Sequence, residues 1–365
     1  GQDARALVTG AGCIVNAGTM AEAPPELLTG LLKQVSRSFY LTLRVLPGGI
    51  RKPIGLAYLL ARTTDSIADT GLVAPEQRLA ALQDLRDRIQ GRRNEPLDFR
   101  GLARRQASCA EAALLQHCEA SLALLRGLPS ADAQLVREVL EIINSGQELD
   151  LRRFAGASAQ SLVALNTDAE LDDYTHRVAG CVGEFWTRIC RAHLFPEAPL
   201  DMAYLLANGA RFGKGLQLVN ILRDVAVDLR HGRCYLPMER LAGSALKPED
   251  LLQRDNEPRL RPLYHAYLDR AEAHLQAGWA YTNALPRRSV RARLACAWPI
   301  LIGCETLKRL RTDNPLDPVQ RIKISRREVW QLVLRSVLRY PWPGAWQKMV
   351  PLEGGKPVAS HGVLP

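Results

Sequence analysis

The sequence predicts an all-α protein that forms a single large helical bundle. Three observations support this prediction. Apolar residues recur at helical spacing along most of the 365 residues, good helix formers such as leucine, alanine and arginine are abundant, and β-branched runs are short. Neither a repeat of solenoid period nor a convincing alternating strand pattern competes with this periodicity.

The helical periodicity is divided by short breaks rich in proline and glycine. These breaks are PGG at 47–49, GLP at 127–129, PEAP at 196–199, LPRR at 285–288 and DNPLDP at 313–318. We expect helices, in chain order, at 26–45, 53–69, 75–92, 103–126, 131–154, 168–193, 199–229, 259–284, 287–312 and 326–339. The pattern favours one bundle over two domains.

The two ends of the chain differ in character from the part between them. Residues 1–19 are low in pattern, and Met20 followed by AEAPPELLTGLLKQV resembles a natural start, so we expect 1–19 to be disordered or a non-native extension. Residues 20–340 form the predicted single domain. Residues 341–365 are rich in proline and glycine and predict an irregular tail.

Composition and charge narrow the function classes. The chain is 47% hydrophobic and 24% charged, which is typical of a globular protein with a large core. The net charge is +10, and the segment from Arg287 to Arg339 holds 13 Lys and Arg against four Asp and Glu. This basic excess suits phosphorylated ligands, an anionic membrane or nucleic acid. No basic patch interleaved with aromatic residues favours RNA, so a nucleic-acid partner is not expected.

The cysteines and the absence of targeting patterns predict a cytoplasmic protein. The eight cysteines form no C-x-x-C pair, so neither a zinc site nor a disulfide framework is indicated, and a reducing compartment is favoured. No apolar run reaches the roughly 20 residues that span a bilayer, and the N-terminus does not resemble a signal peptide. No GxGxxG or P-loop predicts a nucleotide site.

Two acidic pairs carry the strongest chemical signal. RTTDSIADT at 62–70 places Asp65 and Asp69 four residues apart, and on a helix that spacing puts both on one face. Like charges at that spacing cost roughly 0.2–0.5 kcal/mol. RDVAVD at 223–228 repeats the pattern with Asp224 and Asp228. One such pair alone is more often surface decoration, but two matched pairs among apolar neighbours predict a site.

Each pair follows an arginine, Arg62 in the first case and Arg223 in the second. Carboxylates that face each other across a bundle cavity suit Mg²⁺, which binds through one or two carboxylates, substrate phosphates and water. The arginines can donate bidentate hydrogen bonds to phosphate oxygens. This set of residues predicts the loss of diphosphate as a leaving group, with an apolar pocket for the carbocation that remains.

Four ordered blocks resemble the squalene/phytoene synthase family, whose members join two prenyl diphosphates head to head. The blocks are SRSFY at 36–40, YLLARTTDSIADT at 58–70, YTHRVAGCVG at 174–183 and LQLVNILRDVAVDLRHGRCYLP at 216–237. The resemblance spans roughly residues 30–340. It implies an isoprenoid-synthase bundle with a central active-site cavity.

The resemblance implies roles for particular residues. The two acidic pairs are the implied Mg²⁺ ligands. The implied diphosphate contacts are Ser36, Arg37, Arg62, Arg223 and Arg233. Gln217 and Asn220 share the helix face of Asp224 and supply polar lining.

Within the third block, Tyr174, together with Tyr58 from the second, is an implied pocket hydroxyl near the developing cation or at the proton step. His176 is expected to be a structural hydrogen-bonder, and Gly180 and Gly183 are expected to allow close helix contact.

The late segment bears on which member of the family the chain resembles. ACAWPILIG at 295–303 and RIKISRREV at 321–329 resemble squalene-synthase blocks, the second implied to hold NADPH through Lys323 and Arg326. An equal alternative is a solvated helix start capped by Ser325. Ala295 stands where squalene synthases of animals have an aromatic residue, and Trp298 is a candidate replacement.

The function that follows from the resemblance is the condensation of two farnesyl diphosphates to presqualene diphosphate, then NADPH-dependent conversion to squalene. One alternative is a phytoene or dehydrosqualene synthase, or an enzyme that stops at presqualene diphosphate. Another is a helical, basic adaptor that binds membrane or nucleic acid without catalysis. Trp342, Trp346 and nearby basic residues favour peripheral membrane contact. The oligomeric state stays open.

Overall fold

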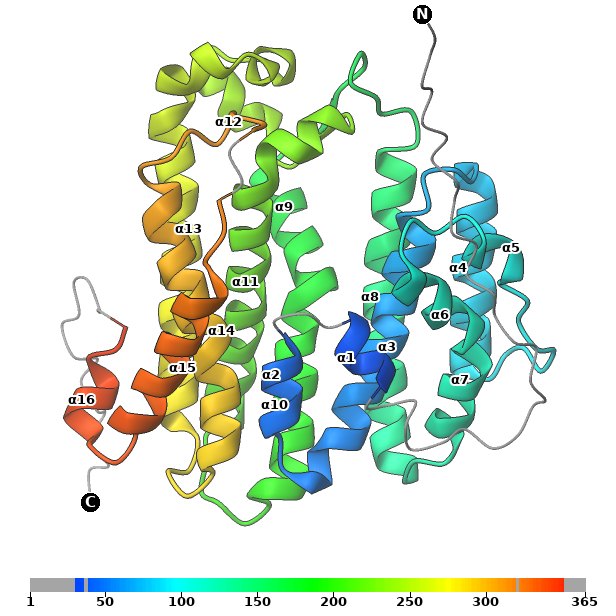
Figure 1. Cartoon of the computed structure of the whole chain (residues 1–365), viewed down its shortest axis with the longest axis vertical. Coiled ribbons are helices and arrows are strands. Elements are labelled where there is room, and N and C mark those ends of the chain that lie inside the picture. Colours follow the sequence, from blue (N-terminus) through cyan, green and yellow to red (C-terminus); the bar gives the residue numbers. More distant parts are fainter. Residues whose placement is uncertain (1–29, 36–38, 320–321, 351–365) are drawn as a thin grey trace, which may run out of the picture.

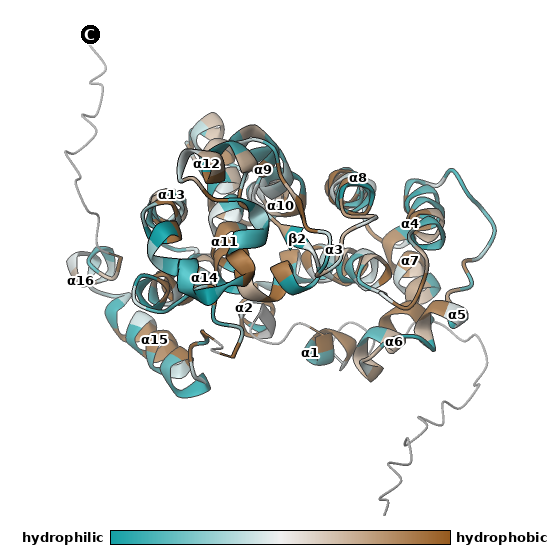
Figure 2. Ribbon diagram, turned by 90° about the horizontal axis from the view of Figure 1, so that it is seen from above, coloured by the Kyte–Doolittle hydropathy of each residue, from teal (hydrophilic) through white to brown (hydrophobic). Residues whose placement is uncertain are grey.

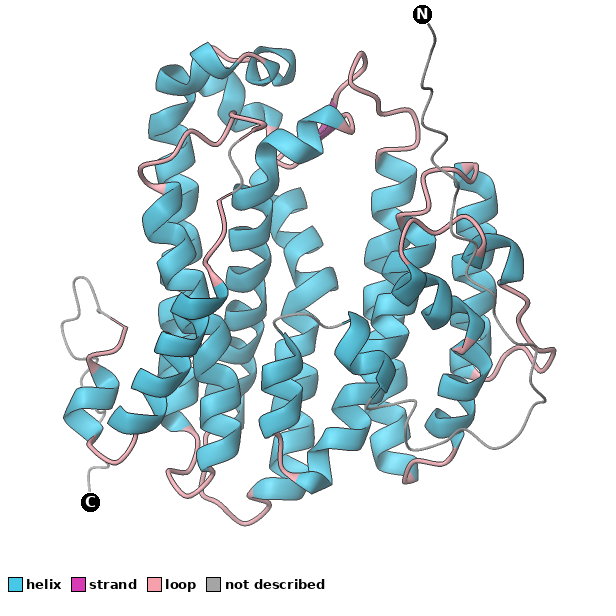
Figure 3. Ribbon diagram, viewed as in Figure 1, coloured by secondary structure: helices cyan, strands magenta, loops and turns pink. Residues whose placement is uncertain are grey.

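The computed structural model describes residues 30–35, 39–319 and 322–350, and most of that chain is helical (Figure 3). The predicted all-α fold is confirmed. The helices are α1 Leu32–Val35, α2 Phe39–Val45, α3 Gly48–Ala68, α4 Pro75–Gln90, α5 Arg100–Ala103, α6 Cys109–Gln116, α7 Cys118–Arg126, α8 Ser130–Arg153, α9 Asp168–Thr175, η2 His176–Gly180, α10 Cys181–Leu194, α11 Met202–Arg230, α12 Met238–Gly243, η3 Pro248–Leu252, η4 Arg254–Asn256, α13 Glu257–Ala284, α14 Val290–Leu310, α15 Arg326–Arg339 and α16 Pro343–Gln347.

Two of the expected helices differ from the structure in a way that has a local cause. The helix expected at 103–126 begins only at Cys109, and it is divided into α6 and α7 because the backbone at His117 leaves the helical range, with φ −96° and ψ 15°. The helix expected at 168–193 is one run, but it contains the π turn η2 between α9 and α10. Such turns insert one residue into a helix and are frequent at functional sites.

Side-chain caps explain where three of the helices begin. The carboxylate of Asp201 accepts from the N–H of Tyr204 (2.9 Å) at the start of α11. Thr167 caps α9 in the same way, and Ser325 caps α15 in a reciprocal capping box with Glu328. Each cap satisfies backbone donors that have no partner within the helix.

The buried apolar side chains form two clusters, one on each side of the molecule. The first joins α3, α4, α6, α7, α8 and α10, and the second joins α11, α13 and α14 with the C-terminal elements. Phe212 on α11 packs against both clusters. Figure 1 shows the same division, with α3 and α8 on one side and α11, α13 and α14 on the other.

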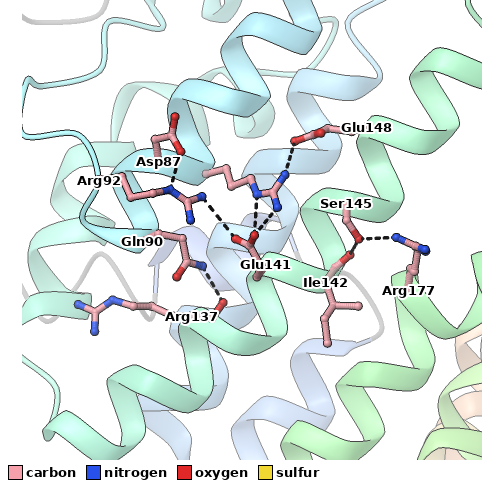
Figure 4. Close-up of polar contacts among 10 residues, drawn as sticks. Asp87, Gln90, Arg92, Arg137, Glu141, Ile142, Ser145, Glu148 and Arg177 are labelled. Carbon is pink, nitrogen blue, oxygen red and sulfur yellow. Dashed lines mark hydrogen bonds and ion pairs between the residues drawn. The ribbon is translucent and has the colours of Figure 1, made fainter.

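Polar contacts hold α8 from two directions (Figure 4). Arg86 on α4 bonds Glu141 through its Nε (2.9 Å) and Glu148 through Nη1 (3.3 Å). From the other side, Arg177 on η2 donates to the hydroxyl of Ser145 (3.0 Å). These contacts fix the rotation of α8 about its axis, and therefore which of its residues face inward.

Helices α10 and α11 approach until their backbones touch. A Cβ on Gly183 would lie 1.8 Å from the carbonyl oxygen of Gly209, and one on Gly213 would lie 2.1 Å from that of Ala179. A Cβ on Gly180 would also lie 3.3 Å from backbone oxygen of α11. The expectation that Gly180 and Gly183 allow close helix contact is confirmed.

A short parallel pairing joins two loops above this contact. Strand β1, Val163–Ala164, pairs with β2, Arg233–Cys234, directly after α11. Gly232 makes the turn with φ +80°, and a Cβ there would lie 2.2 Å from the amide nitrogen of Ser158. The turn therefore requires glycine, because its φ is positive and because there is no room for a Cβ. The turn also sets the position of Arg233, the next residue.

The segment predicted as an irregular tail is described as far as Val350, and in that part it packs on the bundle rather than being irregular. The reason is Trp346 in α16, which is buried and stacks on Trp279 of α13 with ring centroids 5.0 Å apart. Its indole N–H donates to the side-chain oxygen of Asn283 (2.8 Å). No helix within the described residues has the length and apolar character needed to cross a membrane.

Candidate active site

Two adjoining cavities lie at the centre of the bundle. One is polar, the other is mainly apolar, and each has a volume of about 300 Å³. Four residues line both: Asp65, Val178, Gln217 and Asn220. The structure therefore joins a charged compartment to an apolar one, and the two helices that carry the acidic pairs, α3 and α11, contribute to both.

The first acidic pair lies in the last turns of α3. Asp65 accepts hydrogen bonds from Arg62 (3.1 Å) and from the amide of Gln147 on α8 (2.5 Å). Asp69 is the C-cap residue of α3, and its side chain is 70% exposed. Both aspartates line the polar cavity, while Arg62 lines the apolar one and also pairs with Glu111 (3.2 Å).

The second acidic pair lies in the last two turns of α11. Asp224 accepts two hydrogen bonds from its neighbour Arg223, at 2.9 and 2.5 Å. Asp228, one turn later, has no such partner among the hydrogen bonds of the described residues. Both carboxylates line the polar cavity, so the structure brings the four predicted aspartates to one compartment.

Burial raises the pKa values of several of these carboxyl groups. Burial and then the neighbouring charge of Asp224 raise the pKa of Asp228 to about 7, although Arg233 opposes the shift. Burial also raises the pKa of Asp65 to about 6, against the charge of Arg62. Five aspartates and one arginine, Arg233, line the polar cavity, so its acidic groups outnumber its basic ones.

Arg233 connects the sides of the polar cavity. Its Nη1 lies 4.0 Å from Oδ1 of Asp69 and 3.7 Å from Oδ2 of Asp150 on α8. Its guanidinium also lies 5.9 Å from the ring centroid of Phe154. Because β2 and the Gly232 turn hold the backbone, Arg233 faces the cavity from a rigid position.

A chain of hydroxyl groups runs along the wall of the polar cavity. Tyr174 stacks on Tyr235 with ring centroids 5.0 Å apart, and its hydroxyl donates to that of Tyr235 (3.5 Å). The hydroxyl of Tyr235 in turn donates to the carboxylate of Asp150 (3.0 Å). Burial raises the pKa of Asp150 to about 6, so this carboxylate can accept a proton near neutral pH.

Apolar and aromatic side chains, with the helix contact of α10 and α11, enclose the second cavity. Trp186, Phe212 and Tyr281 supply aromatic lining, and Gly183 and Gly213 supply backbone. Tyr58 and Thr42 also line it, as do Ala295, Cys296 and Pro299 of α14. The cavity offers few groups that hold water, so a reactive cation inside it would be shielded from hydrolysis.

The donor set of the polar cavity fits Mg²⁺. Its charged ligand candidates are carboxylate oxygens, the type that Mg²⁺ binds, and burial raises the pKa values of Asp65 and Asp228, a shift that a bound cation would oppose. No group of three or more potential ligands lies close enough to hold an ion alone, within the residues the structure describes. Each acidic pair therefore suits an ion that completes its coordination with water and with oxygen atoms of a bound small molecule, as Mg²⁺ usually does.

The structure does not bring every predicted residue to the cavities. Ser36 and Arg37 lie outside the described residues. Arg223 lines neither cavity, and its guanidinium is bonded to Asp224. Lys323 and Arg326 are exposed and line neither cavity, and Ser325 caps α15 as the alternative interpretation of this segment expects. Trp298 does not replace an aromatic residue at Ala295, because its indole turns to Ser336 on α15 (2.9 Å).

Three residues of the site were not predicted from the sequence. Gln147, Asp150 and Tyr235 all line the polar cavity. Gln147 and Asp150 are one turn apart on α8, among the mainly apolar residues that the helix turns inward, and that interruption is the signal that could have identified them. Tyr235 follows Arg233 in the GRCYLP turn, and nothing in its local pattern indicated a role.

The raised pKa values predict a pH dependence of stability. Folded Asp65, Asp150 and Asp228 hold their protons to higher pH than the unfolded chain does, so the contribution of these three groups to stability is largest at low pH and is lost as pH rises from about 4 through about 7. We expect the melting temperature of metal-free protein to fall between about pH 5 and pH 8. Differential scanning fluorimetry across that range measures the change.

Two additions make this experiment specific. Asp228→Asn should reduce the fall, and Mg²⁺ with pyrophosphate should reverse it, because bound cations favour the charged carboxylates. Asp173→Asn is the matched control, since Asp173 pairs with Arg177 (2.8 Å) outside both cavities. A fall that is unchanged in Asp228→Asn would contradict the assignment to this group.

Comparison with known proteins relates these cavities to a family. The model of the family described as "Squalene/phytoene synthase" matches residues 32–328. A presqualene diphosphate synthase of Rhodopseudomonas palustris is 32% identical over 281 residues, covering 74% of this chain and 83% of that protein. The presqualene diphosphate synthase of Zymomonas mobilis is 30% identical over 303 residues, covering 82% and 89%.

Other matches are more partial or more distant. A bifunctional lycopene cyclase/phytoene synthase of Gibberella fujikuroi is 31% identical over 244 residues, which cover 66% of this chain but only 40% of that longer protein. Among solved structures, TcSQS in complex with the ligand E5700 matches 89% of this chain and 88% of its own, with a TM-score of 0.70 at 20% identity. A squalene synthase from Alicyclobacillus acidocaldarius matches 78% and 93%, with a TM-score of 0.54 at 20% identity.

Proposed function

The chain belongs to the squalene/phytoene synthase family, and from that premise we propose that it joins two farnesyl diphosphates head to head to form presqualene diphosphate. The observation that carries this proposal is the junction of the two cavities. An acidic compartment that contains Arg233 opens into an apolar compartment through residues common to both, among them Asp65 and Asn220. A prenyl diphosphate has the same two parts.

The polar cavity would hold the diphosphate end of the substrate. Asp65, Asp69, Asp224 and Asp228 would bind Mg²⁺, which supplies positive charge to the departing diphosphate. Arg233 already faces this cavity and would donate to phosphate oxygens.

Arg62 and Arg223 would also contact the diphosphate, although their guanidinium groups are bonded to carboxylates at present. Both are engaged by carboxylates in the present structure, Arg62 by Asp65 and Glu111 and Arg223 by Asp224. If Asp65 and Asp224 bound a cation instead, these guanidinium groups would be free to bind phosphate. Gln217 and Asn220, at the junction, would orient the first carbons of the chain, and Tyr58 would face the reacting end from α3.

The apolar cavity would hold the hydrocarbon chains and protect the cation. One substrate loses its diphosphate, and the allylic cation alkylates the double bond of the other. Trp186 and Phe212 would exclude water, which otherwise would convert the cation to an alcohol. Aromatic ring faces also stabilise positive charge near them.

The hydroxyl chain gives the proton lost at ring closure a route. As the cyclopropane forms, a C–H bond breaks and its electrons close the ring. The proton would pass to the oxygen of Tyr174, while the proton of Tyr174 moves to Tyr235 and that of Tyr235 moves to Asp150. Charge and atoms balance, since Asp150 begins as a carboxylate and ends as a neutral acid.

A second candidate function adds the NADPH-dependent step that gives squalene. The segment 321–329, with Lys323 and Arg326, favours it through the resemblance stated above. The relatives named presqualene diphosphate synthase, and the position of Lys323 and Arg326 away from both cavities, favour the shorter reaction.

Product analysis decides between these candidates. We expect purified protein with farnesyl diphosphate and Mg²⁺ to release presqualene diphosphate, identified by mass spectrometry, with the same product when NADPH is added. Squalene formed only with NADPH would favour the second candidate. A single-chain alcohol as the only product would contradict both, and geranylgeranyl diphosphate should be offered in parallel to test for a phytoene synthase.

We also propose that the protein works in the cytoplasm and meets a membrane surface peripherally. The farnesyl substrate is amphiphilic, and a product with two farnesyl chains is far more soluble in a bilayer than in water. A bilayer nearby would therefore take up the product that the apolar cavity releases.

A further inference from the structure

A line of apolar side chains is exposed along α15 and the turn that follows it. Its members, with their exposed fractions, are Trp330 57%, Leu334 60%, Val337 46%, Leu338 59% and Trp342 64%. Their spacing places the helical members on one face of α15. Single exposed apolar residues are normal, but a contiguous line marks an interaction site. We call this line the α15 stripe.

The opposite face of α15 holds the helix firmly to the bundle. Ser336 is fully buried and accepts the indole N–H of Trp298 on α14 (2.9 Å). Glu328, in the first turn, completes the capping box and pairs with Arg309 of α14. Figure 2 shows α15 at the outer edge of the molecule, with hydrophobic and hydrophilic residues mixed along it. The stripe therefore lies on a fixed outward surface.

Positive charge surrounds the stripe. The segment 326–350 contains five basic residues, Arg326, Arg327, Arg335, Arg339 and Lys348. Its one acidic residue is Glu328, which is already engaged by Arg309. An apolar line flanked by arginines, with tryptophan at each end, matches a surface that enters the headgroup region of an anionic bilayer.

A polar pocket next to the stripe supports the same partner. It has a volume of about 260 Å³ and is lined by Arg287, Arg293, Tyr340 and Pro343, among others. Pro343 directly follows Trp342 of the stripe in the chain. The pocket lies on the same α15–α16 segment that carries the stripe, and it contains no acidic lining residue.

Arg293 in this pocket is a buried charge without a counter-ion. Only 6% of the residue is exposed, and its Nε makes no hydrogen bond. The guanidinium donates to Asn283 (2.8 Å) and lies over the rings of Tyr340 and Trp346. Within the described part of the chain it has no carboxylate partner. Buried charges are normally paired, so the pocket suits an anionic group such as a phosphate.

We propose that the α15 stripe docks on a bilayer containing anionic phospholipid, with the pocket of Arg287 and Arg293 receiving a headgroup phosphate. The proposal deepens the peripheral location stated above and does not depend on which product the enzyme makes. A second copy of the chain is a poorer occupant, because a two-fold contact through the stripe would bring the two arginine-rich surfaces together.

Flotation with vesicles tests the proposal. The protein is mixed at low salt with vesicles of phosphatidylcholine alone or of an equal mixture of phosphatidylcholine and phosphatidylglycerol. We expect at least about tenfold stronger binding to the mixed vesicles, weakening as salt is added. The double variant Trp330→Glu/Leu334→Glu should not float, and Arg287→Gln should lose part of the preference for phosphatidylglycerol.

Controls separate docking from damage to the fold. Leu252→Glu changes an exposed leucine (43%) on η3 and should float as the wild type does. The stripe variants should keep the wild-type melting temperature and turnover on dissolved farnesyl diphosphate, since they alter solvent-exposed side chains. A wild type that floats but does not turn over substrate would contradict the proposed function and leave the docking surface intact.

Several outcomes would overturn the docking proposal. One is a wild type that floats with neither kind of vesicle, and another is a double variant that floats normally. A third is a wild-type dimer that the double variant converts to a monomer without any vesicle binding, which would assign the stripe to a second copy. A marked fall in melting temperature with Trp330→Glu would instead show that the chain's own residues cover the stripe.

Discussion

Replacing Asp224 or Asp65 with asparagine lowers the turnover of farnesyl diphosphate by about 10²- to 10³-fold, the first large effect that the structure leads us to expect. Both carboxylates line the polar cavity, from α11 and α3 respectively. In the proposed reaction the charge on the departing diphosphate would be balanced there, and asparagine cannot hold a cation as a carboxylate does.

The fold should survive these substitutions, which makes the measurement interpretable. Burial already disfavours the charged form of Asp65, and the amide of Gln147 can donate to asparagine as it does to aspartate. Steady-state turnover as a function of Mg²⁺ is the measurement. We expect both variants to need more Mg²⁺ as well as to turn over more slowly.

Glu138→Gln is the matched control for the acidic pairs. Glu138 is an exposed carboxylate on α8 that pairs with Arg188 (3.2 Å) and lines neither cavity. Its removal should change turnover by less than about twofold, as surface substitutions usually do. Retention of more than a tenth of wild-type turnover in Asp65→Asn and Asp224→Asn would sink the proposed role of the acidic pairs.

The second large effect concerns stability. Gly183→Ala should destabilise the protein by more than about 4 kcal/mol, or prevent it from folding. The new methyl group would lie 1.8 Å from the oxygen and 2.3 Å from the carbonyl carbon of Gly209. Both are backbone atoms, so α10 and α11 would have to separate along their length rather than move one side chain.

Gly101→Ala provides the comparison. A Cβ at Gly101, in α5, meets nothing within 4 Å, so this substitution should be neutral or stabilising by up to about 1 kcal/mol. Urea unfolding followed by circular dichroism gives both free energies. If Gly183→Ala unfolds within about 1 kcal/mol of the wild type, the close helix contact is not as the structure describes it.

The fold was largely predictable because helical periodicity extends over most of the chain. The details that were not predicted have local causes that the pattern does not encode. At His117 a change of backbone angles divides an apolar run that reads as continuous, and η2 inserts a π turn into a run that also reads as continuous. Neither event changes the period of the side chains enough to be visible in the sequence.

The part of the site formed by a repeated sequence motif was predictable, and the part formed by single residues was not. The two acidic pairs share a spacing and an upstream arginine, so they indicate each other, and the structure brings them to one cavity. Asp150 and Tyr235 come from different elements and meet only through the packing of α8 against the turn after α11. A pairing of that kind depends on tertiary structure, which local pattern does not contain.

The contact between α10 and α11 restricts how this enzyme could change its substrate. On that side the apolar cavity is bounded by glycine and backbone, so no substitution there can widen it, and any larger residue separates the helices. Descendants of this chain that accept longer or shorter hydrocarbon chains would therefore acquire their changes at larger lining residues, such as Trp186 of α10, Phe212 of α11 and the cavity-lining residues of α14. Across such descendants, the glycines at the helix contact should stay invariant while the larger side chains around the cavity diversify.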